Sequence, residues 1–250
     1  MSKKNDFFIG WAETPRADRR FFLGAGLGLL AGTAAAATGL AAWQNPAGSG
    51  SWDMADIREF RGIATAEPYG MLRTLDLDGT PRTVLLVCQG KCGVSAKIGA
   101  LAGQPVVVKG SLIQRGPHAM IAVVDGLDWI RADAQGDING LEFGALETLT
   151  EVSLQGEILD SKCWFGAMSP ATGKVHKACA SLCIRGGIPP AFYVTDQRKQ
   201  TALMILTDRD VGFGKDILPF VADPVSLQGQ LKRQDDVFYL DTSVAQITRL

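Results

Sequence analysis

The stretch PVVVKGSL at residues 105–112 is followed later in the chain by a similar stretch, PVSLQGQL, at residues 224–231. Apolar and β-branched side chains alternate with polar ones there, a pattern that is typical of β-strands. Each stretch also places a glycine at its sixth position, Gly110 and Gly229. A glycine inside a strand is typical of a barrel strand that bends sharply. The two stretches therefore predict two related β domains within one chain.

Further landmarks extend this repeat along the chain. They pair RGI (61–63) with QGE (155–157), YGM (69–71) with FGAM (165–168), TVLLV (83–87) with TALMIL (201–206) and MIAV (120–123) with VFYL (237–240). The first copy then covers about residues 56–131 and the second residues 151–250, with a linker at residues 132–150. The alternative is that two unrelated β domains share this spacing by chance.

The segments 94–102 and 214–222 interrupt the strands of the two copies, and each predicts one short helix. Four or five strands with a short helix between the third and the fourth resemble the OB-fold, a small, partly open Greek-key barrel. The resemblance implies a mainly β chain with two OB-like barrels in tandem, but it implies no particular function. It requires Gly62 to superpose on Gly156, and the glycines of the two quoted strands to superpose on each other.

An uncharged apolar segment at residues 21–43 predicts a transmembrane helix or uncleaved signal anchor. As a helix it would reach about 30 Å, enough to span the hydrocarbon core of a bilayer. Basic residues in the preceding segment, 1–20, place that segment in the cytoplasm by the positive-inside rule. The rest, which starts with a linker at 44–55, is then periplasmic in a protein that crosses a bacterial inner membrane once. Cleavage among the small residues at 34–37 is the alternative to retention.

The motif RRFFL at residues 19–23 resembles the twin-arginine export motif. That motif is a receptor-read address for proteins that are exported already folded. Asp18 stands where the motif usually carries serine or threonine. The alternative is that Arg19 and Arg20 only fix the orientation of the anchor in the membrane.

The arginines and the apolar segment together are also similar to the anchor of the Rieske iron–sulfur subunits of bc1-type complexes. This resemblance covers the anchor alone. A Rieske cluster needs two cysteine and two histidine ligands, whereas the two histidines of this chain, His118 and His176, do not form the required boxes with cysteines. The chain is therefore not expected to carry a Rieske cluster.

One histidine and three cysteines lie close together in the second copy, at Cys163, His176, Cys179 and Cys183. Imidazole and thiolate are ligands that suit zinc, copper or iron, so we expect a transition metal or no cofactor at all. If residues 176–183 form a helix, spacings of three and four place the last three side chains on one face. Cys163 would then join them from the preceding strand.

These ligands lie in or beside an insertion, residues 169–191, that the first copy lacks. Two alternatives to a metal site stay open. The periplasm is oxidising and favours disulfides, so two of the three cysteines could be bridged, with His176 on the surface. The cysteines could also be reactive thiols. Separately, the sequence CQGKC at residues 88–92 predicts a disulfide between Cys88 and Cys92 across a glycine-containing turn.

Composition and motifs exclude several classes of function. The chain has 25 basic and 26 acidic residues and a formal net charge of -1, which predicts no phosphate-binding surface and no nucleic-acid partner. We find no Ser/His/Asp order, no close carboxylate pair and no dinucleotide fingerprint, so a non-enzymatic role is favoured. His118, in the motif RGPH, is expected to be a solvated residue at a hairpin tip.

The leading interpretation is a membrane-anchored periplasmic accessory or ligand-binding subunit of a redox system, with a metal or cofactor site in the second copy. Its partners would be the membrane and other subunits of a membrane or periplasmic redox complex. The alternative is a disulfide-stapled structural or interaction protein without metal. A thiol–disulfide enzyme is the least supported reading, because the chain contains no CxxC motif.

Overall fold

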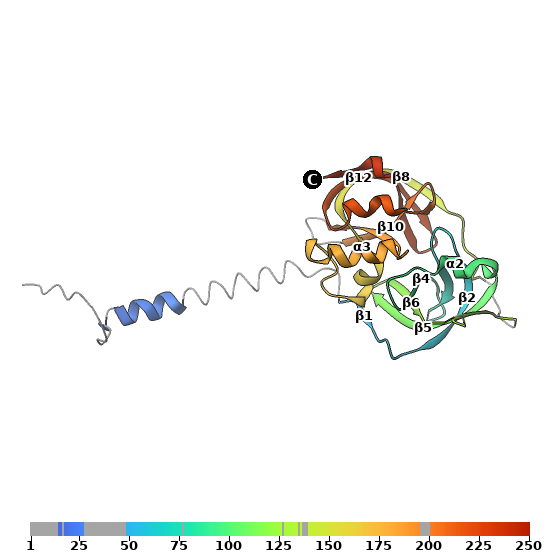
Figure 1. The fold of residues 1–250 in the computed structure, drawn as a ribbon, viewed down its shortest axis with the longest axis horizontal. Helices are drawn as coiled ribbons and strands as arrows, with labels where there is room; N and C mark the ends of the chain where they lie inside the picture. Colours follow the sequence, from blue (N-terminus) through green and yellow to red (C-terminus); the bar gives the residue numbers. More distant parts are fainter. Residues whose placement is uncertain are drawn as a thin grey trace, which may run out of the picture. The chain divides into compact units, whose positions relative to one another are not determined.

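The structure is a computed structural model that describes residues 15–16, 18–27, 49–76, 78–126, 128–134, 136, 140–195 and 201–250. The chain divides into two compact units, Met1–Asn45 and Pro46–Leu250. The second unit contains two β-barrels, the first drawn in blue to green and the second in yellow to red (Figure 1). The prediction of a mainly β chain with two barrels is confirmed.

In the first unit, residues 18–27 are helical. The apolar side chains of Phe21, Phe22, Leu23 and Leu27 are exposed there. The remainder of the expected anchor, residues 28–43, lies outside the described residues. In the described part of the chain, no helix is both long enough and apolar enough to cross a membrane.

Within the described residues, the first barrel is closed by five strands in the cyclic order β2-β3-β4-β6-β5, and the pair β4–β6 is parallel. A short helical segment connects β4 to β5, as predicted. The elements are β2 (Arg58–Thr65), β3 (Met71–Leu75), β4 (Pro81–Cys88), α2 (Ser95–Ile98), η1 (Gly99–Leu101), β5 (Pro105–Arg115) and β6 (His118–Val123). Two shorter strands, β1 (Ser51–Trp52) and β7 (Ile130–Ala132), pair with β5.

The second barrel repeats this order, and its described strands β8-β9-β10-β13-β12 close through the parallel pair β10–β13. Its elements are β8 (Glu147–Asp160), β9 (Pro190–Thr195), β10 (Thr201–Asp208), η4 (Lys215–Phe220), β12 (Pro224–Gln234) and β13 (Val237–Asp241). Short additions are β11 (Val211–Gly212), η5 (Val244–Gln246) and β14 (Ile247–Arg249). Both barrels thus place a short helix before their fourth strand.

Strand register shows that one glycine of each barrel occupies an equivalent position. Gly62 on β2 lies opposite Val106 on β5, and Gly156 on β8 lies opposite Val225 on β12. Val106 and Val225 each follow the first proline of the strands quoted from the sequence. The two glycines therefore occupy the same position in the two barrels, as predicted.

Gly110 and Gly229 also share one role. A Cβ at Gly110 would lie 2.5 Å from the carbonyl oxygen of Ala122 on β6, and one at Gly229 would lie 2.6 Å from that of Asp241 on β13. Such a distance is far inside van der Waals contact, so the strands can approach this closely only where no side chain is present. The close approach of the neighbouring antiparallel strand therefore explains both glycines.

The landmark that pairs YGM with FGAM is wrong. Met71 on β3 lies opposite Leu85, and its counterpart in the second barrel is Ala191, which lies opposite Ile205. The FGAM sequence at 165–168 is therefore not the equivalent of YGM. Its resemblance is local, because the extra segment of the second barrel starts directly after β8 and occupies residues 161–189, where residues 169–191 were expected.

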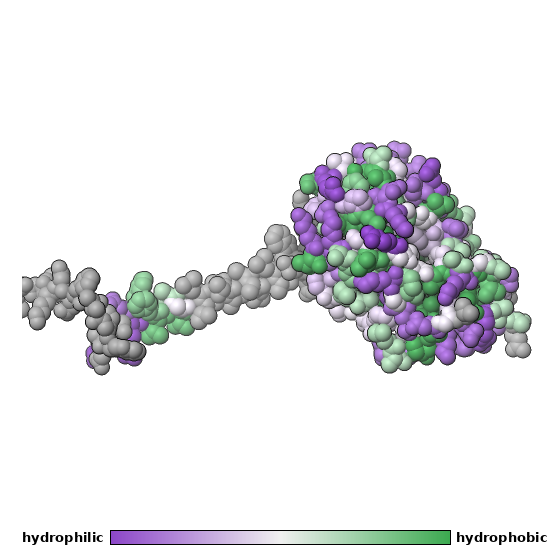
Figure 2. All heavy atoms as spheres, viewed as in Figure 1, coloured by the Kyte–Doolittle hydropathy of each residue, from purple (hydrophilic) through white to green (hydrophobic). Residues whose placement is uncertain are grey.

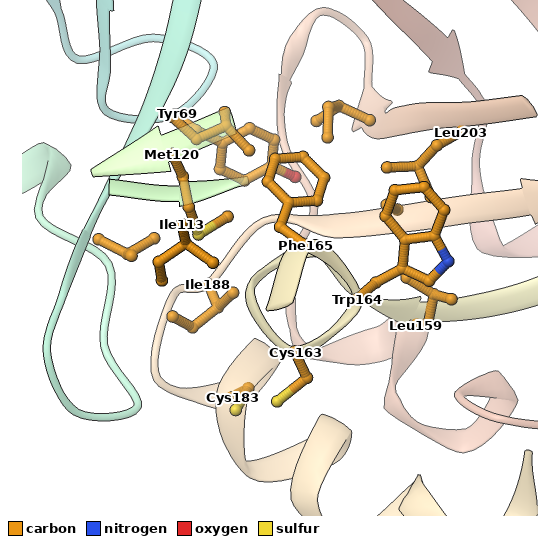
Figure 3. Close-up of a cluster of buried hydrophobic side chains, with 14 of the residues drawn as sticks. Tyr69, Ile113, Met120, Leu159, Cys163, Trp164, Phe165, Cys183, Ile188 and Leu203 are labelled. Carbon is orange, nitrogen blue, oxygen red and sulfur yellow. The ribbon is translucent and has the colours of Figure 1, made fainter. Parts of the chain in front are cut away.

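Each barrel has its own apolar core, and a third apolar cluster joins the two (Figure 3). The third cluster, which we call the shared cluster, combines Ile113 and Met120 of the first barrel with Trp164, Phe165 and Leu203 of the second. Because these side chains are buried only while the barrels pack together, apolar burial couples the two barrels.

Polar contacts reinforce the packing between the barrels. The Tyr69 hydroxyl donates a hydrogen bond of 2.6 Å to the carbonyl oxygen of Leu206 and accepts one of 2.8 Å from the amide of Phe213. The amide of Thr83 donates to the carboxylate of Asp236 at 3.1 Å. Pro46–Leu250 therefore forms one compact unit although it contains two barrels.

Candidate metal centre

The insertion of the second barrel begins where β8 ends. The carboxylate of Asp160, the last residue of β8, accepts a hydrogen bond of 2.8 Å from the amide of Cys163 and fixes the turn η2 (Cys163–Ala167). The chain then forms η3 (Lys174–His176) and α3 (Lys177–Arg185) and returns to the barrel through Gly186 and Gly187. A helix is thus present where one was expected at residues 176–183, but it starts at Lys177, and His176 lies in η3 before it.

This local structure brings three thiols together. The sulfur atoms of Cys163, Cys179 and Cys183 all lie within 4.8 Å of one another. Cys179 and Cys183 are one helical turn apart on α3, while Cys163 reaches them from η2, and Figure 3 shows the side chains of Cys163 and Cys183 side by side. All three are free thiols, so the alternative of a disulfide between two of them does not describe this structure.

His176 belongs to a neighbouring group. Its Nε2 atom lies 3.0 Å from Oδ2 of Asp160, and ligand atoms of His176, Asp160 and Cys163 lie within 4.8 Å of one another. His176 is buried, which corrects the alternative that it is a surface residue. Cys163 is shared by both groups, whereas His176 is not part of the group with Cys179 and Cys183.

A lysine from the first barrel completes the surroundings of the thiols. Lys91 Nζ lies 2.8 Å from Sγ of Cys179 and 3.8 Å from Sγ of Cys183. Lys91 lies inside the loop that the disulfide Cys88–Cys92 closes, with a Cα–Cα distance of 5.4 Å, so the predicted disulfide is confirmed. The thiol site is therefore built from both barrels.

Hydrogen bonds to main-chain atoms hold this disulfide loop in place. The buried ammonium of Lys162 donates hydrogen bonds of 2.7 to 2.8 Å to the carbonyl oxygens of residues 88, 89 and 90. The amide of Gly93 donates to the carbonyl oxygen of Gly186 at 3.0 Å. A Cβ at Gly186 would lie 1.8 Å from the carbonyl oxygen of Lys91, so the loop can lie against the end of α3 only because Gly186 lacks a side chain.

The chain matches no family model and no curated protein. Its chemistry is therefore inferred from its own residues.

The electrostatics of the site favour a thiolate at Cys183. The hydrogen bond that the Cys163 thiol donates lowers the pKa of Cys183, and the Lys91 ammonium lowers it further. The same contact raises the pKa of Cys163, so that one of the pair keeps its proton. The contact with Cys179 raises the pKa of Lys91, which stays charged. Thiolate is the form of cysteine that binds metals and attacks electrophiles.

Three residues of this site were not predicted from the sequence. Lys91 and Lys162 supply its positive charge, and Asp160 fixes both the turn at Cys163 and the ring of His176. A local signal was available for two of them. Lys162 directly precedes Cys163, and Lys91 lies between the disulfide-bonded cysteines. Nothing in the sequence indicated that the disulfide loop 88–92 lies beside the three thiols of the second barrel.

Proposed function

We propose that this chain is a membrane-anchored periplasmic accessory subunit of a redox system, and that it binds one soft transition-metal ion on Cys163, Cys179 and Cys183. The observation that carries the proposal is the convergence of three thiols within 4.8 Å beside a lysine ammonium. Three thiols in one place are rare unless they bind a metal or react with each other, and these three remain free.

The donor set fits a thiophilic ion. Zinc binds thiolates at about 2.3 Å, which places the sulfurs of a tetrahedral site about 3.8 Å apart. Small rotations of the side chains would bring three sulfurs that already lie within 4.8 Å to that spacing. Copper(I) and iron also suit thiolate ligands. The positive charges of Lys91 and Lys162 would offset the charge of the thiolates.

Export is supported by two features. The disulfide Cys88–Cys92 is typical of proteins in oxidising compartments such as the periplasm. Exposed apolar side chains at Phe21 and Phe22 follow the arginine pair on a helix, as expected for the beginning of a membrane anchor. A twin-arginine route would suit a cofactor that is loaded in the cytoplasm, because that route exports folded proteins.

The second candidate is a structural protein without metal. It is favoured by one observation, namely that Trp164 and Phe165 of the insertion lie in the shared cluster between the barrels. In that case the insertion would serve to join the barrels, and the thiols would be incidental.

Metal analysis of the full-length chain, purified in detergent after native export, distinguishes the two candidates. We expect about one zinc, copper or iron ion per chain, lost in Cys179→Ser and in Cys183→Ser and retained in the control Ser181→Ala on the same helix. Binding should weaken with falling pH, because protons compete with the metal for the thiolate ligands. A metal-free chain with an intact thiol count would refute metal binding and favour the second candidate.

The assignment to a redox system needs its own experiment. An epitope-tagged full-length chain, extracted in mild detergent, should co-purify with subunits of a membrane oxidoreductase identified by mass spectrometry. A chain that is recovered alone after cross-linking in intact membranes would contradict this part of the proposal.

A further inference from the structure

The thiol site opens to solvent on one side. Cys163 and Cys183 are buried, whereas Cys179 is half-buried. Lys91 contacts Cys179, and four further exposed residues lie near it along η3 and α3; we call the surface of these five residues the Cys179 face: Lys91, Lys174, Val175, Leu182 and Arg185. Any molecule that approaches the thiols from solvent meets this surface first.

The Cys179 face carries an apolar stripe. Val175 is 84% exposed and Leu182 is 51% exposed, and they lie four residues before and three residues after Cys179. Val175 lies in η3, directly before α3, and Leu182 lies on α3, so exposed apolar side chains precede and follow Cys179 along this segment. In Figure 2, which has the viewpoint of Figure 1, hydrophobic and hydrophilic residues adjoin on the side of the unit that carries α3.

The same surface is positively charged. Apart from the buried Lys162, residues 161–195 contain three basic residues, Lys174, Lys177 and Arg185, and no acidic residue, in a chain whose formal net charge is -1. Lys177 forms an ion pair with Asp223 at 2.8 Å. Among the described residues, Lys174 and Arg185 have no carboxylate partner within ion-pair distance. The charge of this face is therefore local and uncompensated.

We infer that the Cys179 face docks an acidic partner protein that delivers the metal ion to the thiol site, an inference that rests on the proposed metal binding. Basic side chains around an apolar centre favour a partner with acidic side chains around an apolar centre, because such charges steer association and fix orientation. Cys179 is the thiol that this partner can reach, so it would be the first ligand of the incoming ion.

Transfer would proceed by exchange of thiolate ligands. A bond forms between the metal ion and Sγ of Cys179 as a bond between the ion and a thiolate of the partner breaks, and the proton of the Cys179 thiol passes to the released sulfur. The oxidation state of the ion does not change. Cys183, which is already a thiolate, then displaces a second thiolate of the partner without proton transfer, and the Cys163 thiol passes its proton to the sulfur that it displaces.

Two synthetic peptides test the inference. Each carries one zinc ion on a CxxC pair, flanked by glutamates in one peptide and by lysines in the other. They are mixed with the metal-free full-length chain in neutral detergent, and zinc transfer is measured after rapid separation. We expect the acidic peptide to deliver zinc at least about tenfold faster at low ionic strength, with the difference shrinking as salt is raised.

Variants localise the effect. Lys174→Glu combined with Arg185→Glu should abolish or reverse the preference for the acidic peptide. The control Arg209→Glu, at a side chain that is 90% exposed on the second barrel, should leave it unchanged. Val175→Ser combined with Leu182→Ser should slow transfer from the acidic peptide while uptake of zinc from zinc chloride stays as in the wild type.

Uptake from zinc chloride also separates the two proposals. A chain that takes up no zinc from the free salt contradicts metal binding and the docking surface together. A chain that binds free zinc but receives it equally fast from both peptides contradicts the docking surface alone. The same conclusion follows if the charge reversal at Lys174 and Arg185 has no more effect than the Arg209 control.

Discussion

The ammonium of Lys91 lies 2.8 Å from the sulfur of Cys179, although the two residues are 88 positions apart and belong to different barrels. The contact depends on the disulfide loop of the first barrel and on the end of α3 in the second, which meet at Gly186. Loss of the packing between the barrels would therefore separate the charge of Lys91 from the thiols.

Replacing Lys91 by methionine should make the metal-free thiols less reactive. The pKa of Cys183 is held down first by the hydrogen bond from Cys163 and then by the charge of Lys91. Without that charge the pKa rises, and a smaller fraction of Cys183 is thiolate at neutral pH. Alkylation by iodoacetamide, followed against pH, should shift to higher pH in Lys91→Met and not in the exposed control Lys97→Met. Unchanged profiles would show that Lys91 does not act on the thiols.

Alanine at Gly110 or at Gly229 should destabilise the protein. The new Cβ would lie 2.5 or 2.6 Å from a carbonyl oxygen of the neighbouring strand, so the barrel must open locally, at about 1 to 3 kcal/mol. Gly214→Ala is the matched control, because a Cβ there meets nothing within 4 Å and the backbone φ is -75°. Denaturant unfolding measures the difference. Equal stability of all three variants would argue against the close approach of the neighbouring strands at these positions.

Leu85→Ala and Leu203→Ala should each lower the free energy of unfolding by about 2 to 5 kcal/mol, as truncation of buried leucines does. Both residues lie in the shared cluster and line the same small cavity. We therefore expect the double variant to be non-additive, because the first truncation already loosens the packing that the second removes. Leu86→Ala, in the core of the first barrel alone, is the control and should add to Leu203→Ala. Strict additivity in the first pair would mean that the barrels are not coupled there.

Stability should fall as the pH decreases below neutrality, because of His118. Burial against Trp164 and Phe165, together with the charge of Arg82, lowers the pKa of this imidazole in the folded protein. The unfolded state then takes up a proton first, as the pH falls through the ordinary histidine pKa of about 6.5. The contribution of His118 to the free energy of unfolding therefore decreases from about this pH down to the pKa of folded His118 and is constant below it.

The variant His118→Gln, which cannot take up a proton, isolates this effect. Its unfolding free energy should depend less steeply on pH than that of the wild type between about pH 7 and about pH 5. The measurement is denaturant unfolding at each pH. Identical slopes for the two proteins would show that His118 titrates equally in the folded and unfolded states.

Export should depend on the arginine pair. If the chain uses the twin-arginine route, Arg19→Lys combined with Arg20→Lys should block export, which can be followed by protease accessibility in spheroplasts. Reporter fusions placed after residue 43 should be active outside the membrane, and fusions before Arg19 should be inactive there. Normal export of the double variant would indicate another pathway, and the reverse reporter pattern would contradict the proposed topology.

Local sequence patterns predicted most of the fold. The alternating pattern of two strands and their mid-strand glycines, Gly110 and Gly229, predicted two barrels. A side chain at either glycine would prevent the neighbouring strand from approaching. The short helices before these strands and the disulfide Cys88–Cys92 were predicted correctly for the same kind of reason, since each depends on neighbouring residues.

Predictions that depend on contacts between residues far apart in the sequence were less accurate. The FGAM sequence was matched to YGM by composition, and only strand pairing shows that Ala191 is the true counterpart of Met71. His118 was expected in solvent at a hairpin tip. The hairpin is present, but the side chain is half-buried against Trp164 and Phe165, because the second barrel covers it.

For the site, the sequence by itself determined the donor atoms and their helical spacing, since Cys179 and Cys183 are one turn apart on any helix. The tertiary structure decided which donors meet. It placed Cys163 beside both of them, turned His176 towards Asp160, and brought Lys91 across from the other barrel. The physical reason is that helical spacing fixes positions only within one turn or two, whereas contacts across 88 residues depend on how two buried apolar surfaces pack.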